Sequence, residues 1–510
     1  MAPRIESTRR LFDGSSPWLL TVAMFGVAGL FSVGAIAASA ASAALTSVAP
    51  VGAISAGSAS SAISNHPAPA ARDECVVATI ASGEEAPAER LRALAGADYW
   101  VEADHDLLLC SRGGVVSAGE LGAAATAAGA LAVTGHSGVD PERLAFLKVT
   151  PDLHAEELGR VLARGGRWVV VELASGLPPA PRDRVRVGPA LFPFEANRVL
   201  ARRWSQRQHG VGEALTDPQI AAMLDEIDRD RWFADVSTLA AWNRWTRGTQ
   251  VLSARDWLVA QFAALDHVEV TTASFPVGAD TAWNVIATLP GTLRPEEWYV
   301  VGGHYDSTSN DPSVAAPGAD DNASGCAGTL ELARLFAAHP PDATMVFICF
   351  SGEEQGLYGS EDYVADLIAA GDLAKVQGAY VLDMIAFTAS VQLDCILETE
   401  SFAQPWLNHF ADAAADFTTL GIVMEYGVCC SDHAPFLWQS SPAVLAIEAD
   451  YPSNPNYHTM DDVPGYLSPL LAEQILRMGG GALLRLAGST AIFVDGFESA
   501  GTERWSSSAP

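Results

Sequence analysis

The sequence predicts an α/β sandwich over residues 217–490, in which helices flank a central, mostly parallel or mixed sheet. Val-rich runs of strand length, such as WYVV and TMVFICF, alternate with segments whose apolar residues recur at helical spacing. Three of these runs end at polar residues. Because ligands bind beyond the carboxyl ends of strands in open α/β sheets, such endings are typical of a binding crevice.

The helices and strands of this region are expected in a definite order. Asp217 and Pro218 suit the start of a helix over residues 217–229, since they are favoured at the N-cap and in the first turn. A second helix, SARDWLVAQFAAL, precedes two paired strands, VEVTTASFPV and AWNVIATLPG. Further helices are predicted in ASGCAGTLELARLFAAH and YLSPLLAEQILRMGGGALLRLAG, and the charged residues of the last argue against a membrane span.

The sequence pattern of residues 71–190 predicts a second, smaller α/β domain. Short apolar runs, CVVAT, LLLCS and RWVVVEL, are typical of strands, and the segments AERLRALA and HAEELGRVLARG have helical spacing. Residues 191–216, in which Arg and Gln interrupt the hydrophobic pattern, are expected to connect the two domains.

The N-terminus has the features of an export signal. An apolar, Ala-rich stretch follows Arg9 and Arg10 and ends in small residues that suit signal peptidase, so we expect residues 1–45 to be a cleaved signal peptide. An uncleaved stretch would act as a membrane anchor, but no basic flank follows it. Residues 46–70 are predicted to be a flexible linker, and residues 491–510 a fraying tail. The mature protein is therefore expected to be secreted or periplasmic, without membrane attachment.

The composition restricts the classes of partner. The 510 residues include 30 Lys and Arg against 61 Asp and Glu, a formal net charge of −31 that would repel nucleic acids and anionic membranes. Seven cysteines are an odd number for an exported chain, so at least one cannot pair within the chain. Cys75 and Cys110 are a candidate pair within the smaller domain.

Five potential metal ligands have distinctive local settings: His304 in GGHYDS, Asp321 in GADDNASG, Glu354 in SGEEQGLYGS, Asp383 in VLDM and His458 in YHTMDD. Three come at strand ends and two from loops, so they can converge in one crevice. Imidazole and carboxylate ligands together suit zinc, whereas oxygen-only sets suit magnesium or calcium. The set predicts a two-metal hydrolase site.

These motifs resemble those of the bimetallic zinc aminopeptidases, a family that includes secreted bacterial leucyl aminopeptidases and, more distantly, glutamate carboxypeptidases and glutaminyl cyclases. The resemblance covers roughly residues 217–488. It implies that Asp321 bridges two Zn²⁺ ions, that His304 and Asp383 bind one ion, and that Glu354 and His458 bind the other. Glu353 matches the family's general base, which takes a proton from the attacking water and returns it to the leaving amine.

The same resemblance gives roles to residues around the ligands. Asp306 and Asp462 are similar to carboxylates that orient the imidazoles of His304 and His458. Tyr457 is similar to a phenol that hydrogen-bonds the oxyanion of the tetrahedral intermediate.

Other features of this region are expected to have structural rather than catalytic roles. The Asp321–Asn322 peptide matches one that is cis in the family. Relatives have a disulfide near Cys429 and Cys430, but with a different spacing, so the partner is left open, with Cys395 as one candidate. Cys326 and Cys349 lie in core-like patterns, Asp320, Asp461 and Glu361 are expected to be ordinary solvated carboxylates, and His433 is expected to shape its loop.

We therefore expect an exported zinc aminopeptidase that acts on peptides with a free N-terminus, and we interpret residues 71–190 as a prosegment that assists folding or blocks the site. The alternatives are a carboxypeptidase or glutaminyl cyclase of the same superfamily, or a catalytically inactive binding module. A carboxypeptidase needs basic residues to receive a carboxylate, and few Lys or Arg occur near the motifs. The intact ligand set and Glu353 argue against an inactive module.

Overall fold

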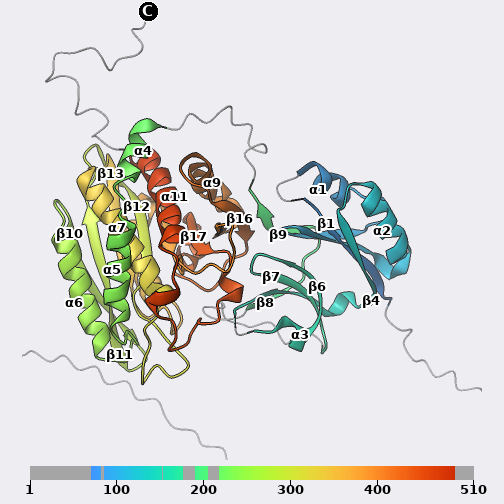
Figure 1. Cartoon of the computed structure of the whole chain (residues 1–510), viewed down its shortest axis with the longest axis horizontal. Coiled ribbons are helices and arrows are strands. Elements are labelled where there is room, and N and C mark those ends of the chain that lie inside the picture. Colours follow the sequence, from blue (N-terminus) through green and yellow to red (C-terminus); the bar gives the residue numbers. More distant parts are fainter. Residues whose placement is uncertain (1–70, 82–84, 152, 176–189, 205–216, 489–510) are drawn as a thin grey trace, which may run out of the picture. The chain divides into compact units, whose positions relative to one another are not determined.

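The computed structural model describes residues 71–81, 85–151, 153–175, 190–204 and 217–488 (Figure 1). The predicted signal peptide, the linker and the C-terminal tail lie outside these residues. Within the described ranges, every helix is too short or too polar to cross a membrane.

A mixed sheet of thirteen strands runs through the described chain, in the order β10-β11-β13-β12-β14-β17-β15-β16-β9-β2-β3-β1-β4. Its central strands β13, β12, β14 and β17 are parallel, while β10 and β11 form an antiparallel hairpin at one edge. This confirms the predicted α/β class with a mixed sheet. The strands of the larger domain are β10 (Glu269–Val277), β11 (Asp280–Leu289), β12 (Arg294–His304), β13 (Ala343–Phe350), β14 (Val376–Leu382), β15 (Asp394–Thr399), β16 (Gly421–Tyr426) and β17 (Ala443–Glu448).

Helices cover both faces of this sheet. Successive strand residues point to opposite sides, so each face presents its own apolar side chains to a core. Tyr299 and Val301 face the core beneath α4 to α7, α9 and α11, whereas Val300 faces the core beneath α8 and α10. The helices are α4 (Pro218–Leu224), α5 (Arg229–Ala240), α6 (Gln250–Ala263), α7 (Gly325–Ala338), α8 (Tyr358–Ala370), α9 (Gln404–Phe417), α10 (Ala434–Trp438) and α11 (Pro469–Ala487).

The helix predicted over residues 217–229 is shorter than expected. Asp217 caps α4 and Pro218 lies in its first turn as predicted, but α4 ends at Leu224. Asp228 then caps α5, accepting hydrogen bonds from the backbone N–H groups of Asp230 and Arg231. A second N-cap residue therefore divides the predicted helix in two.

The smaller N-terminal part contains the three predicted strands, with CVVAT in β1, LLLCS in β3 and RWVVVEL largely in β7. Besides the thirteen-stranded sheet it holds a four-stranded sheet in the order β6-β7-β5-β8. Its elements are β1 (Asp73–Thr79), α1 (Glu85–Arg92), β2 (Tyr99–Ala103), β3 (Asp106–Ser111), α2 (Ala118–Ala127), β4 (Ala132–Val139), β5 (Leu144–Lys148), α3 (Ala155–Leu158), β6 (Gly159–Gly165), β7 (Trp168–Leu173), β8 (Ala190–Pro193) and β9 (Arg198–Arg203).

The prediction of a helix in HAEELGRVLARG is wrong over most of that segment. Only α3 is helical, and β6 begins at Gly159 and pairs with β7. A Cβ atom at Gly159 would lie 2.1 Å from the carbonyl oxygen of Glu172, so the close approach of these strands requires glycine there. Hairpin pairing with β7 overrides the helical pattern of the segment.

The predicted connector, residues 191–216, contains most of β8 and all of β9 in its described portion. β9 pairs with β2 of the smaller part and with β16 of the larger part, so the sheet continues across the predicted boundary. One apolar core also contains residues of both parts: Phe146 and Trp168 lie in the same cluster as Ile396, Val423 and Leu445. The two predicted domains thus share structure within the described ranges.

A chain that begins at residue 217 should be markedly less stable than one that begins at residue 71. It would uncover part of the surface of Ile396, Val423 and Leu445, and each such side chain contributes about 1.5–3 kcal/mol when fully buried. Calorimetric unfolding temperature and size-exclusion chromatography would measure the loss. A monomeric fragment that unfolds at the temperature of the longer chain would contradict a shared core.

Candidate metal centre

Three adjacent parallel strands deliver four of the predicted site residues to one edge of the sheet. His304 is the last residue of β12, Asp383 directly follows β14, and Glu353 and Glu354 follow β13. Because β13, β12 and β14 are parallel neighbours, their carboxyl ends meet. His304, Glu353 and Asp383 are almost completely buried there.

Asp321 reaches the same edge from the turn between β12 and α7. The Asp321–Asn322 peptide is cis, as the resemblance predicts. The Asn322 side chain donates a hydrogen bond to Leu382 O and accepts one from Gly325 N, which fastens the turn to the end of β14. A Cβ atom at Gly325 would lie 2.2 Å from Leu382 O, so glycine lets α7 begin against this strand.

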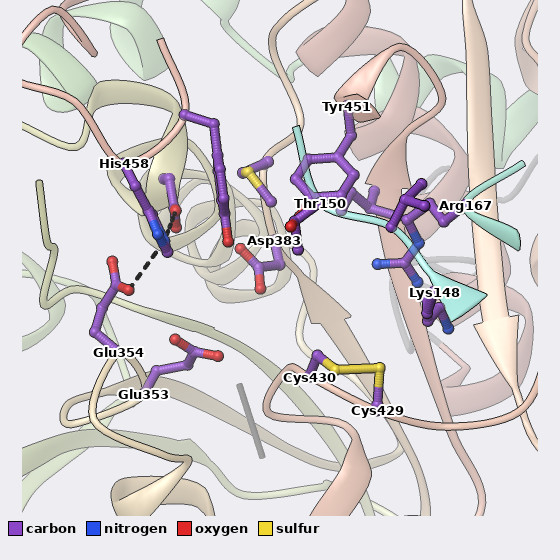
Figure 2. Close-up of a pocket in the computed structure, with 15 residues that line it drawn as sticks. Lys148, Thr150, Arg167, Glu353, Glu354, Asp383, Cys429, Cys430, Tyr451 and His458 are labelled. Carbon is purple, nitrogen blue, oxygen red and sulfur yellow. Dashed lines mark ion pairs between the residues drawn. A yellow bond between two sulfur atoms is a disulfide. The ribbon is translucent and has the colours of Figure 1, made fainter. Parts of the chain in front are cut away.

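The two oxygens of Asp321 face two different imidazoles. Oδ1 lies 3.4 Å from His304 Nε2, and Oδ2 lies 3.1 Å from His458 Nε2. Asp383 Oδ1 is also 3.4 Å from His304 Nε2. Glu354 Oε2 is 3.2 Å from His458 Nε2, an ion pair that Figure 2 marks with a dashed line. The structure thereby divides the five predicted ligands into two groups that share Asp321.

The donor atoms of these groups fit divalent cations. His304 Nε2, Asp383 Oδ1 and Glu354 Oε1 are buried and have no hydrogen-bond partner among the described residues. Such unsatisfied polar atoms are costly unless a ligand satisfies them. Two sets place their ligand atoms within 4.8 Å of one another: His304 with Glu353 and Asp383, and His304 with Asp321 and Glu354. The second set joins residues of both groups through Asp321. Mixed nitrogen and oxygen donors suit zinc.

Glu353 lies beside these groups, but its carboxyl group is beyond hydrogen-bond distance of His304. Its Oε2 lies 3.9 Å from His304 Nε2, and its backbone N–H donates to Asp306 Oδ1 at 3.3 Å. Burial raises the pKa of Glu353 well above its usual range, and the carboxylates of Glu354 and Asp383 add to this rise while His304 opposes it. A buried carboxyl group with a raised pKa can both take up and return a proton.

The two predicted orienting carboxylates lie where expected in the chain but differ in what they contact. His304 Nδ1 lies 3.1 Å from the backbone oxygen of Asp306 and 3.7 Å from its carboxylate, which accepts a hydrogen bond from Thr246 instead. The Asp462 carboxylate accepts hydrogen bonds from the backbone N–H groups of Asp320 and Asp321. Asp462 therefore positions the turn that carries Asp321, rather than the His458 ring.

Tyr457 lines the pocket beside the candidate ligands. Its ring stacks on that of His458 at 3.8 Å between centroids and meets the edge of Tyr451 at 5.3 Å. These contacts fix the phenol next to the site, and its role toward an oxyanion stays a prediction.

Asp320 is buried, so its interpretation as a solvated carboxylate is wrong. It accepts hydrogen bonds from Ala386 N and Asn454 Nδ2. Glu448, which is also fully buried, accepts from the same Ala386 N–H group. The two carboxyl groups connect the Asp321 turn to the loop that follows β14.

The sequence interpretation missed two basic residues of the pocket, Lys148 and Arg167, which come from the smaller part of the chain. They lie across the pocket from His458 and Glu354 (Figure 2). Both are buried and form ion pairs with Glu398 and Glu425, with Arg167 Nε 3.2 Å from Glu425 Oε2. The sequence LAFLK could have indicated Lys148. Side chains alternate along a strand, so Lys148 lies on the same inward side as Phe146.

The described cysteines form three disulfides and leave one thiol free. Cys75–Cys110 is confirmed. Cys326 and Cys349, expected only as core residues, also form a disulfide. Cys429 and Cys430 pair with each other, so Cys395 is not their partner and is instead free and buried.

Comparisons with known proteins agree with the motifs. The profile of Peptidase family M28 matches residues 284–478. A probable zinc metalloprotease of Leptosphaeria maculans is 34% identical over 293 residues, which cover 47% of this chain and 68% of that protein. A probable leucine aminopeptidase of Trichophyton verrucosum is 29% identical, covering 49% of this chain and 70% of that protein.

Other matches are more local. A probable zinc metalloprotease of Pyricularia oryzae is 40% identical over 186 residues, which cover 31% of this chain and 36% of that protein. The chain thus spans little more than a third of the length of this relative. The solved LapA aminopeptidase of Legionella pneumophila is 16% identical, covering 81% of this chain and 98% of that chain, with a TM-score of 0.48. A solved glutaminyl cyclase of an Acidobacteriales bacterium is 19% identical, covering 51% of this chain and 95% of that chain, with a TM-score of 0.44.

Replacing Asp462 by Ala should destabilise the folded protein by roughly 2–5 kcal/mol, because two buried backbone N–H groups lose their acceptor. Tyr466→Phe is the matched control. The Tyr466 hydroxyl donates to Asp462 at 2.6 Å, and its removal deletes one hydrogen bond at a cost of about 1 kcal/mol. Urea unfolding of both variants would measure the difference, and equal losses would contradict the positioning role of Asp462.

Proposed function

Because the chain belongs to peptidase family M28, we propose that it is a zinc-dependent peptidase, and specifically an aminopeptidase that uses two Zn²⁺ ions. The observation that carries the proposal is the position of Asp321, whose two carboxylate oxygens face His304 and His458 at 3.4 and 3.1 Å. A single-ion site would not require a carboxylate placed between two imidazoles.

The residues of the two groups would hold the ions, with Asp321 shared, His304 and Asp383 on one side, and Glu354 and His458 on the other. When bound, such ions polarise the scissile carbonyl and make the attacking water more acidic. The chain itself holds the ligands in place, since Asn322 and Asp462 fix the turn that carries Asp321.

Proton transfer falls to Glu353. Its carboxyl group is close to His304 but is not fixed by a hydrogen bond to it, so it can take a proton from water and deliver it to the leaving amine. We assign to Tyr457, whose ring stacks on that of His458, a hydrogen bond to the developing oxyanion.

Selection for a free N-terminus is supported by the charge of the site. Glu353, Glu354, Asp321 and Asp383 make the ligand end of the pocket acidic, which favours an α-ammonium group. The relative from Trichophyton verrucosum, named a probable leucine aminopeptidase, supports the same choice.

A carboxypeptidase is the second candidate, because Lys148 and Arg167 line the same pocket and could receive a carboxylate. Their ion pairs with Glu398 and Glu425 already neutralise them. We therefore place the aminopeptidase first.

Three kinds of substrate would separate the candidates. We expect hydrolysis of leucyl-nitroanilide, little cleavage of an N-blocked peptide with a free C-terminus, and little cyclisation of a peptide that begins with Gln. Hydrolysis should disappear with a zinc chelator and return with added Zn²⁺. Cleavage of the N-blocked peptide alone would favour the carboxypeptidase, and the absence of chelator-sensitive hydrolysis in the whole panel would refute a peptidase.

Glu353→Gln should lower kcat for leucyl-nitroanilide by roughly 10²–10⁴-fold, the usual contribution of general acid–base catalysis, while zinc content stays unchanged. Glu269→Gln is the matched control, since Glu269 is exposed at the start of β10. Steady-state kinetics and metal analysis would measure both. A Glu353→Gln variant with the kcat of the control would exclude Glu353 as the base.

We also propose that the protein is exported through cleavage of residues 1–45 and acts outside the cytoplasm. The three disulfides support this location, because disulfides persist in oxidising compartments and are rare in the cytosol.

N-terminal sequencing of the protein from its native host should find a mature chain that starts near residue 46, directly after the apolar stretch and its small residues, which include Ala40 and Ala43. The small residues there suit signal peptidase. A start before residue 30 would contradict cleavage and favour a retained anchor.

A further inference from the structure

The disulfide between Cys429 and Cys430 joins neighbouring residues in the loop that links β16 to α10. Both cysteines line the pocket that holds Glu353, Glu354 and Asp383. In Figure 2 the S–S bond faces the same cavity as these carboxylates. A reactive covalent bond is therefore part of the wall of the candidate active site.

The loop is anchored on both sides of this disulfide. Lys148 Nζ donates to Gly427 O at 3.0 Å, and the backbone N–H of Cys429 donates to Glu398 Oε1 at 3.2 Å. His433 Nε2 lies 3.2 Å from the same Glu398 oxygen. These contacts hold the residues that flank the disulfide to buried groups.

The next residue after the disulfide contacts a candidate metal ligand. Ser431 Oγ donates a hydrogen bond to Asp383 Oδ2 at 2.6 Å. The other oxygen, Asp383 Oδ1, then faces the site and lies 3.4 Å from His304 Nε2. Ser431 therefore sets the rotation of the Asp383 carboxylate. Partners that orient metal ligands in this way affect metal affinity and activity strongly.

The conformation of Cys430 makes this arrangement dependent on the disulfide. Its φ is +72°, a value that residues other than glycine rarely adopt. The covalent ring formed with Cys429 restrains the backbone there. Once the S–S bond is broken, this covalent restraint is lost and Cys430 can return to negative φ, which would move Ser431 away from Asp383.

The exposure of the cysteines makes this disulfide the accessible one of the three among the described residues. Cys75, Cys110, Cys326 and Cys349 are completely buried, whereas Cys430 is only partly buried. The free thiol of Cys395 is also completely buried. A reductant that enters the pocket therefore meets Cys430 first.

We propose that the Cys429–Cys430 disulfide is a redox-sensitive positioning element of the active site, which holds Ser431 against Asp383 only in its oxidised state. This inference rests on the proposed peptidase function. Under the proposed export, the reduced chain inside the cell would be less active than the oxidised chain outside it.

The chemical step is thiol–disulfide exchange with a dithiol. One thiolate of the reagent attacks the Cys430 sulfur, the S–S bond breaks, and Cys429 leaves as a thiolate that takes up a proton. The second thiol of the reagent then displaces Cys430. The chain gains two electrons and two protons, and the dithiol becomes a cyclic disulfide.

The test treats the full zinc-loaded chain with dithiothreitol, removes the reagent by gel filtration, and alkylates one aliquot for peptide mass spectrometry. We expect labels on Cys429 and Cys430 and none on the four other disulfide cysteines. The kcat for leucyl-nitroanilide should fall about tenfold and recover when an unlabelled aliquot is reoxidised with oxidised glutathione.

Two variants separate positioning from other effects of the reagent. A Cys429→Ala/Cys430→Ala chain should start with about tenfold lower kcat and not respond to dithiothreitol, so any removal of zinc by the reagent would show there. Ser431→Ala, which keeps the disulfide, should show a similar fall, and reduction should then lower kcat less than twofold further. An equal response of the double variant and the natural chain would overturn the proposal.

Labelling and zinc content also test the proposal without peptidase activity. If the oxidised chain hydrolyses none of the substrates, the proposed function fails, while loss of zinc on labelling of Cys429 and Cys430 would still support the positioning role. Complete labelling with unchanged kcat and unchanged zinc content would overturn it. So would resistance of these two cysteines to a dithiol that opens another disulfide.

Discussion

The position of the Asp321 carboxylate is the constraint on which the rest of the site depends. A carboxylate that serves two imidazoles must be fixed in both rotation and position, because each oxygen has its own partner. Two hydrogen bonds from the turn to Asp462 and one from Asn322 to Leu382 supply this fixation. The start of α7, the end of β14 and the loop that carries His458 are therefore built around a single side chain.

Much of this arrangement follows from rules that act over short distances in the sequence. Val-rich runs mark buried strands, and the carboxyl ends of parallel strands lie at one edge, so His304, Glu354 and Asp383 could be expected to meet. The α/β class and the β10–β11 hairpin follow from periodicity in the same way. Asp321 and His458 come from loops, and their convergence with the others was predicted from the family resemblance.

Features that depend on contacts between distant parts of the chain could not be predicted in this way. Lys148 and Glu398 are 250 residues apart, and nothing local to either residue identifies the other. Asp462 was expected to orient His458, four residues away, yet it accepts hydrogen bonds from residues 141 and 142 positions away. The helical pattern after His154 gave way to a nearer contact, because β6 pairs in a hairpin with β7, which follows it directly in the chain but lies outside the pattern.

The buried ion pairs explain why the smaller part of the chain belongs to the site. Glu398 on β15 and Glu425 on β16 have no exposed surface, and a buried carboxylate without a counter-charge is strongly destabilising. Lys148 and Arg167 supply that counter-charge from the four-stranded sheet and its hairpin. The same pairing neutralises one wall of the pocket while the ligand end keeps its carboxylates. The packing of the smaller part thereby fixes the charge distribution that a substrate would meet.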